Sequence, residues 1–149
     1  NLHHKTVELI PDYAKSLVWQ KDYEALKNQY HIAQQQNRML ELLDGQVQYL
    51  VTECSLPQIL YYNENYADNI CDVAKTRQQI MDWYKQFNNV NVVIERGDKP
   101  YVHTGRFQDE EQARAIDFGL RATLRHEGMA FTPLKPDIQA IHDFAATLL

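Results

Sequence analysis

Residues 90–104 read VNVVIERGDKPYVHT, and this stretch decides between an all-helical fold and a mixed one. Its first five residues are rich in β-branched side chains, which favour strands. Residues 95–100 contain Gly97, Asp98 and Pro100, a composition typical of a turn. Residues 101–104 then return to apolar and β-branched side chains. The stretch predicts an antiparallel β-hairpin with strands at 90–94 and 101–104.

Helical patterns surround this hairpin on both sides. Ser55 with Gln58, and Asp109 with Gln112, have the three-residue spacing of a capping box at a helix start. Gly128 is suited to the end of the helix that starts after Asp109. Apolar spacing predicts further helices at 68–87 and 136–148, and a short third strand at 129–132. The sequence therefore predicts a helix-dominated α+β fold, with residues 1–149 forming a single domain.

The first fifty residues carry a heptad-like row of mostly apolar side chains, at Trp19, Tyr23, Leu26, Tyr30, Ala33, Asn37, Leu40, Val47 and Val51. The row predicts one long helix within residues 1–51, which either packs on its own domain or forms a dimerisation arm. In the second case Leu26, Tyr30, Asn37 and Leu40 form the interface of a homodimer, and Asn37 fixes its register. Residues 52–149 then form the globular α+β body.

Composition and charge exclude several classes of protein. Hydrophobic residues make up 44% of the 149 residues and charged residues 23%, which excludes a disordered or collagen-like chain. The net charge of −5 argues against a nucleic-acid partner. No apolar run is long enough to span a membrane. The chain begins at Asn1 without a signal-peptide pattern and ends in a helical pattern, which favours a domain excised from a larger protein.

Motifs for catalysis, metal binding and cofactor binding are missing from the sequence. It contains no Gly-x-Ser-x-Gly, no phosphate-binding glycine loop, no Cys-x-x-Cys and no histidines at ligand spacing. We therefore expect no catalytic residues, no metal and no cofactor, and an enzyme is the least favoured class. Cys54 and Cys71 are compatible either with one disulfide or with two free thiols.

Arginines offer the strongest candidate for a ligand site. Arg114 and Arg121 are seven residues apart, so they share one face of the helix that starts after Asp109. Arg106 precedes this helix, and the hairpin carries Tyr101 and His103. If these side chains converge, they form a site for a carboxylate or phosphate group. The alternative is that the arginines pair with local carboxylates at the surface.

In its order of elements, the predicted architecture resembles the extracytoplasmic sensor domains of bacterial receptors. Those domains lie between two membrane helices and dimerise through their first helix, but they continue with more strands than are predicted here. The resemblance implies a non-enzymatic regulatory or sensory input domain that binds a small polar or anionic ligand or a protein partner. It also favours an extracytoplasmic location with flanking membrane helices over a cytoplasmic one. The alternative is a self-contained protein-interaction adaptor or assembly factor without a small ligand.

Overall fold

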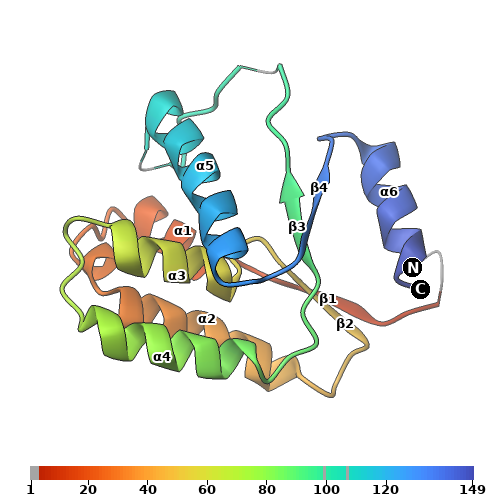
Figure 1. The fold of residues 1–149 in the computed structure, drawn as a ribbon, viewed down its shortest axis with the longest axis horizontal. Coiled ribbons are helices and arrows are strands. Elements are labelled where there is room, and N and C mark those ends of the chain that lie inside the picture. The colour runs from red at the N-terminus through yellow and green to blue at the C-terminus, as the bar shows by residue number, and fades with distance from the viewer. Residues whose placement is uncertain (1–3, 99, 107) are drawn as a thin grey trace.

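A computed structural model describes residues 4–98, 100–106 and 108–149. Helices dominate an α+β fold, as the sequence predicts (Figure 1). The elements in chain order are β1 (Val7–Ile10), α1 (Tyr13–Trp19), a 3₁₀ turn η1 (Ala25–Lys27), α2 (Gln29–Leu43), β2 (Tyr49–Thr52), α3 (Leu56–Asn65), α4 (Val73–Tyr84), β3 (Asn91–Ile94), α5 (Glu110–His126), β4 (Phe131–Leu134) and α6 (Ile138–Thr147).

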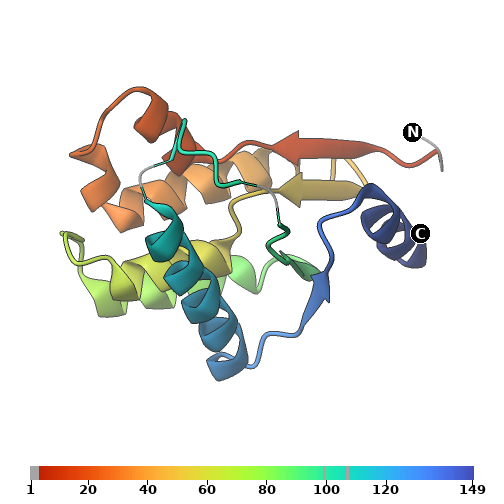
Figure 2. The same ribbon diagram turned by 90° about the horizontal axis from the view of Figure 1, so that it is seen from above.

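The strands form two separate parallel pairs, β1 with β2 and β3 with β4 (Figures 1 and 2). The predicted antiparallel hairpin is therefore wrong, because β3 pairs with residues 131–134 and residues 101–104 lie in a loop. Parallel strands need a crossover connection, and α5 supplies it between β3 and β4. The helices between β1 and β2 make the same kind of connection. Each pair is thus a strand–helix–strand unit.

The predicted long helix across residues 1–51 is also wrong, because the segment divides into β1, α1, η1, α2 and β2. Lys21 and Gly45 adopt positive φ angles of 58° and 77°, which a helix cannot continue through. Asn28 begins α2 by accepting a hydrogen bond from the His31 backbone N–H. Only the middle of the apolar row packs on the core, since Leu26, Ala33, Asn37 and Leu40 are buried, whereas Trp19, Tyr23 and Val51 are exposed.

That core lies among α1, α2, α3 and α4, with β1 and the start of the β2–α3 connection at its edge. Leu26 and Leu40, two of the residues predicted to form a dimer interface, are buried in it at 8% exposure each. Asn37 is also buried, and its side-chain amide donates to Glu41. The Tyr30 ring lies 6.0 Å from that of Trp83 on α4. All four residues therefore pack within their own chain, while the homodimer itself stays a prediction.

The fully buried side chain of Gln36 connects the ends of β1 and β2. Its Oε1 accepts a hydrogen bond from the backbone N–H of Tyr13 at 3.0 Å. Its Nε2 donates to the carbonyl of Pro11 at 3.0 Å and to the hydroxyl of Thr52 at 3.2 Å. The Thr52 hydroxyl donates in turn to the carbonyl of Cys54 at 3.0 Å. This network fixes both chain segments where they leave their strands.

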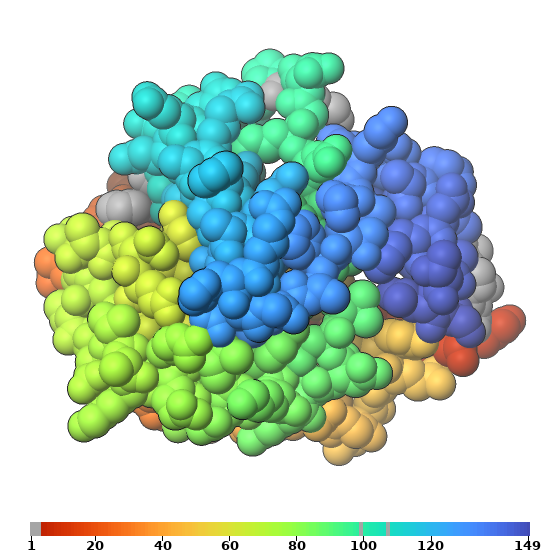
Figure 3. Space-filling model, viewed as in Figure 1, coloured from red at the N-terminus to blue at the C-terminus, as the bar shows by residue number. Residues whose placement is uncertain are grey.

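Helix α6 differs from the other helices because none of its residues is buried. It lies at one end of the molecule, near β1 and β2 (Figures 2 and 3). The hydroxyl of Tyr49 on β2 donates to the carbonyl of Leu148 at 2.8 Å. Within the described residues, no helix is both long and apolar enough to cross a membrane.

Candidate functional site

A cavity of about 530 Å³ lies where the chain leaves β1 and β2, and a later part of the long connection between β3 and α5 forms another of its walls. Asp12 follows β1, Glu53 and Cys54 follow β2, and Arg106 belongs to the connection after β3; all four residues line the cavity. The remaining walls come from α1, η1, α2 and α3. Ligands of proteins with parallel sheets bind outside the carboxyl ends of the strands. The carboxyl ends of β1 and β2 lie at this cavity in the same way.

The floor of the cavity is apolar. Leu26, Ile32 and Ile59 line it and are at most 8% exposed. Tyr62 and Tyr66 add aromatic surface with hydroxyl groups. Burial raises the pKa of Tyr62 to about 12, so its hydroxyl is neutral and able to donate at pH 7. A bound molecule would meet both an apolar surface and hydrogen-bonding groups here.

Cys54 lies in the cavity wall with only 3% exposure. Burial raises the pKa of its thiol well above the usual range, and the nearby Asp12 carboxylate raises it further. The thiol is therefore protonated at neutral pH and is a weak nucleophile. This environment gives no support to Cys54 as a reactive cysteine.

Both cysteines are free in the structure, which agrees with the second of the two redox states that the sequence allows. The Cys71 thiol donates to the side-chain oxygens of Asn63 at 3.2 Å and Asn69 at 3.0 Å. Its sulfur also accepts from the hydroxyl of Thr76 at 3.3 Å. Cys71 thus belongs to a polar network between α3 and α4, away from the cavity that contains Cys54.

Three of the five predicted ligand-site residues come together in the loop after β3. The His103 ring lies 4.8 Å from the ring of Tyr101, and the guanidinium of Arg106 lies 5.1 Å over it. Of these three, only Arg106 lines the cavity. The structure brings neither Arg114 nor Arg121 to it. Arg114 is exposed and pairs with Glu110 at 3.0 Å, as the surface alternative predicts.

Sequence reasoning missed the two acidic residues that line this cavity. Asp12 is recognisable as a helix start, and it does accept a hydrogen bond from the backbone N–H of Lys15 at 3.1 Å. Glu53 follows the short apolar run of residues 49–51, which the prediction of one long helix absorbed. A polar residue directly after a strand would have been the signal, but neither β1 nor β2 was predicted.

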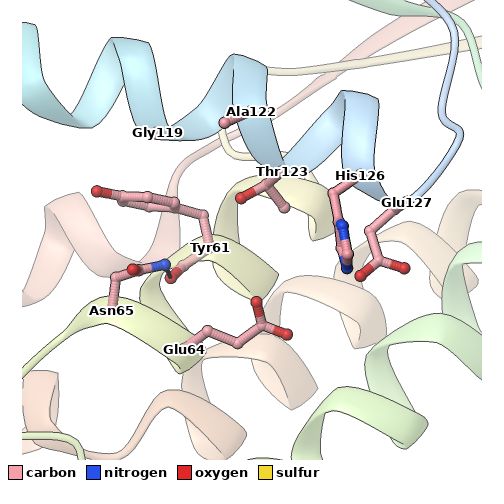
Figure 4. A pocket seen from close by; sticks show the side chains of 8 residues that line it. All are labelled: Tyr61, Glu64, Asn65, Gly119, Ala122, Thr123, His126 and Glu127. Carbon is pink, nitrogen blue, oxygen red and sulfur yellow. Dashed lines mark hydrogen bonds between the residues drawn. The ribbon is translucent and has the colours of Figure 1, made fainter.

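A second, smaller cavity of about 280 Å³ lies between α3 and α5 (Figure 4). Its acidic side chains, Glu64 and Glu127, are both paired with Arg77 of α4. The Arg77 guanidinium lies 2.5 Å from a carboxylate oxygen of Glu127 and 3.4 Å from one of Glu64. Because Arg77 partly neutralises both carboxylates, these two ion pairs connect α4 to α3 and to the end of α5. Among the residues that the structure describes, no three acidic, His or Cys side chains form a metal site.

The same helix contact depends on a glycine. A Cβ atom at Gly119 of α5 would lie 2.4 Å from the ring of Tyr61 on α3. The missing side chain therefore lets the two helices approach with the Tyr61 ring between them.

Compared with models of protein families, with curated proteins and with solved structures, the chain has no significant match.

Proposed function

We propose that the chain is a regulatory or sensory domain that binds a small organic molecule in the cavity at the strand ends. The observation that carries the proposal is the position of this cavity, which is lined by segments that follow β1, β2 and β3. Its volume of about 530 Å³ falls within the range of roughly 300–1,000 Å³ that is usual for small-molecule sites. Apolar floor residues and a few polar groups are also the usual lining of such sites.

The connection after β3 supports a regulatory role for binding. It closes one side of the cavity and also contacts α1, since a Cβ atom at Gly105 would lie 2.4 Å from the ring of Trp19. Gly105 has a positive φ of 73°, which other residues rarely adopt. A ligand that contacts both this connection and α1 would stabilise their association. Ligand binding would thereby change the surface that the chain presents at Trp19.

Cys54 provides a direct test of ligand binding, because it lies in the cavity wall while Cys71 does not. Fragments from a soluble library would be screened by nuclear magnetic resonance for binding to the whole chain. A fragment that occupies the cavity is expected to slow alkylation of Cys54 by N-ethylmaleimide at least tenfold, because it blocks access to the thiol. Mass spectrometry of the two cysteine peptides would measure both rates.

The alkylation rate of Cys71 is the internal control for this experiment. A fragment that slows both rates by the same factor would be stabilising the whole fold rather than filling the cavity. The proposal is contradicted if no binding fragment protects Cys54 in preference to Cys71.

A second candidate function, the adaptor that associates through its surface, is favoured by one specific observation. Val7, Leu9 and Val51 on β1 and β2 are each more than half exposed. Leu9 and Val51 are also partners in the register of this sheet, so their side chains form one apolar surface. Parallel sheets usually have both faces covered. A homodimer formed here, rather than through the predicted interface of Leu26, Tyr30, Asn37 and Leu40, would cover this surface with a second copy of the chain.

Sedimentation equilibrium tests the homodimer. If two copies meet at this surface, Leu9→Lys is expected to convert a dimer into a monomer, because it places a charge in an apolar contact. Ile70→Lys is the matched control, since Ile70 is 69% exposed but lies in the loop before α4. A wild-type chain that stays monomeric at high concentration, or a Leu9→Lys variant that still dimerises, would contradict a homodimer through this surface.

A further inference from the structure

Among the described residues, charged side chains of both signs line the cavity in equal numbers. Asp12 and Glu53 supply two carboxylates, and Lys15 and Arg106 supply two cations. Within the described part of the chain, none of these four forms an ion pair. Because charges of both signs face one cavity without pairing, they are available to a ligand that carries both signs itself.

Arg106 is suited to hold the anionic group of such a ligand. Its guanidinium lies 5.1 Å over the ring of Tyr101, which restrains the side chain without using the N–H donors in ion pairs. Arg96 lies near the same ring, 5.8 Å from its centre, but its guanidinium is bonded to the carboxylate of Asp117. A guanidinium binds a carboxylate through two parallel hydrogen bonds. Of the two arginines at this ring, Arg106 is therefore the one whose donors are open to a ligand.

Asp12 and Glu53 are suited to the opposite charge. One oxygen of Asp12 accepts the backbone N–H of Lys15 at 3.1 Å, but a carboxylate has further lone pairs to offer. The charge of Asp12 also reaches the cavity wall, since it contributes to the raised pKa of the Cys54 thiol. An ammonium group has three donors and no acceptor, which matches carboxylates.

The apolar floor of the cavity indicates that the ligand also carries an apolar group beside its two charged groups. Leu26, Ile32 and Ile59 would remain uncovered beneath a small polar molecule such as glycine. A ring or branched chain that lies on these residues would remove apolar surface from water on both sides of the contact.

We propose that the cavity binds an α-amino acid with a large apolar side chain, held at its carboxylate by Arg106 and at its ammonium group by Glu53 and Asp12. This inference rests on the small-molecule function proposed above and names the class of ligand. It narrows the small polar or anionic ligand expected from the sequence to one that carries both charges, because carboxylates line the same cavity as Arg106. Lys15, at the start of α1, adds positive charge for the ligand carboxylate.

Three probes that each contain a phenyl ring separate the contributions of the two charges to the binding affinity. L-Phenylalanine carries both, phenethylamine carries only the ammonium group, and 3-phenylpropionate carries only the carboxylate. Titration calorimetry on the whole chain is expected to show phenylalanine binding at least tenfold more tightly than either analogue. Each missing charge removes a charge-assisted hydrogen bond, which corresponds to a loss of about ten- to a hundredfold in affinity.

Two variants assign the charges to residues. Arg106→Gln is expected to lower the affinity for phenylalanine about tenfold or more while leaving the affinity for phenethylamine unchanged. Glu53→Gln is expected to lower the affinity for phenylalanine and to leave the affinity for 3-phenylpropionate unchanged. Both residues are exposed in the free protein, so neither replacement should prevent folding. Arg114→Gln is the matched control, since Arg114 lies outside the cavity, and it should change no affinity.

The outcomes distinguish this inference from the function on which it rests. If a single-charge analogue binds as tightly as phenylalanine, or if none of the three probes binds while other fragments protect Cys54, the amino-acid ligand is wrong and the small-molecule site remains. If no fragment protects Cys54, both fail. Phenylalanine binding that Arg106→Gln and Glu53→Gln leave unchanged would also overturn the inference.

Discussion

Replacement of Leu40 by glutamate is expected to destabilise the fold strongly rather than to dissociate a dimer. Leu40 is 8% exposed and belongs to the core among α1, α2, α3 and α4. A carboxylate there would lose the packing of the leucine and would be buried without a partner, a change that costs at least about 4 kcal/mol. Domains of this size have a total stability of about 5–15 kcal/mol. Urea denaturation followed by circular dichroism would measure the loss.

Leu42→Glu is the matched control for this variant. Leu42 lies on the same helix two residues away, but it is 75% exposed. Its replacement is expected to change the free energy of unfolding by no more than about 0.5 kcal/mol. A Leu40→Glu chain that stays fully folded and converts a dimer to a monomer would show that the apolar row of α2 faces a second chain.

Replacement of Gln36 by leucine is the second change with a large expected effect. Leucine is similar in size and more apolar, but it cannot bond the backbone N–H of Tyr13 or the carbonyl of Pro11. Each buried polar group left without a partner costs about 1–3 kcal/mol. The free energy of unfolding is therefore expected to fall by about 3 kcal/mol, although the side chain becomes more hydrophobic.

Gln34→Leu on the same helix provides the comparison, because Gln34 is exposed. This variant is expected to be as stable as the wild type within about 0.5 kcal/mol. Gln36→Leu should also disturb the strand ends, which amide chemical shifts of residues 11–13 and 52–54 would report. Equal stability of the two variants would show that the Gln36 network contributes nothing net to folding.

The parts of the fold that could be predicted from the sequence are those that depend on local chemistry. Asp109 and Gln112 form the predicted capping box at the start of α5, and Gly128 ends that region with a positive φ of 68°. Ser55 caps α3 by accepting from the backbone N–H of Gln58, as its spacing predicts. Caps and turns are determined by a few neighbouring residues, so a single sequence is enough to reveal them.

The pairing of the strands could not be predicted, because it depends on residues far apart in the chain. The four strands are each only four residues long, and Leu9 pairs with Val51 across three intervening helical segments. The row from Trp19 to Val51 has the spacing of a helix and is in fact shared among several elements. Periodicity indicates which residues could share a face, but Trp19 and Val51 are exposed, so it reports neither the burial of each residue nor what covers it.

The candidate site was hidden for the same reason. Asp12, Glu53 and Arg106 are separated by tens of residues and line one cavity only because the long connection after β3 reaches the ends of β1 and β2. Arg114 and Arg121 form an evident sequence pattern, but the cavity is lined by neither. Regular spacing on one helix is visible in a sequence, whereas convergence of separate loops requires the topology.

Proline at position 133 determines where the β3–β4 sheet can grow. The carbonyl of Leu134 accepts the backbone N–H of Glu95 at 2.8 Å, so the backbone of Leu134 faces β3 and, by alternation along the strand, that of Pro133 faces outward. Proline has no N–H to offer to a further strand. The outer edge of β4 is thereby protected from edge-to-edge aggregation, whereas β3, with the sequence NVVI, has no proline to interrupt pairing on its other side. Any extension of this sheet, by another segment or by another molecule, is therefore directed to one side.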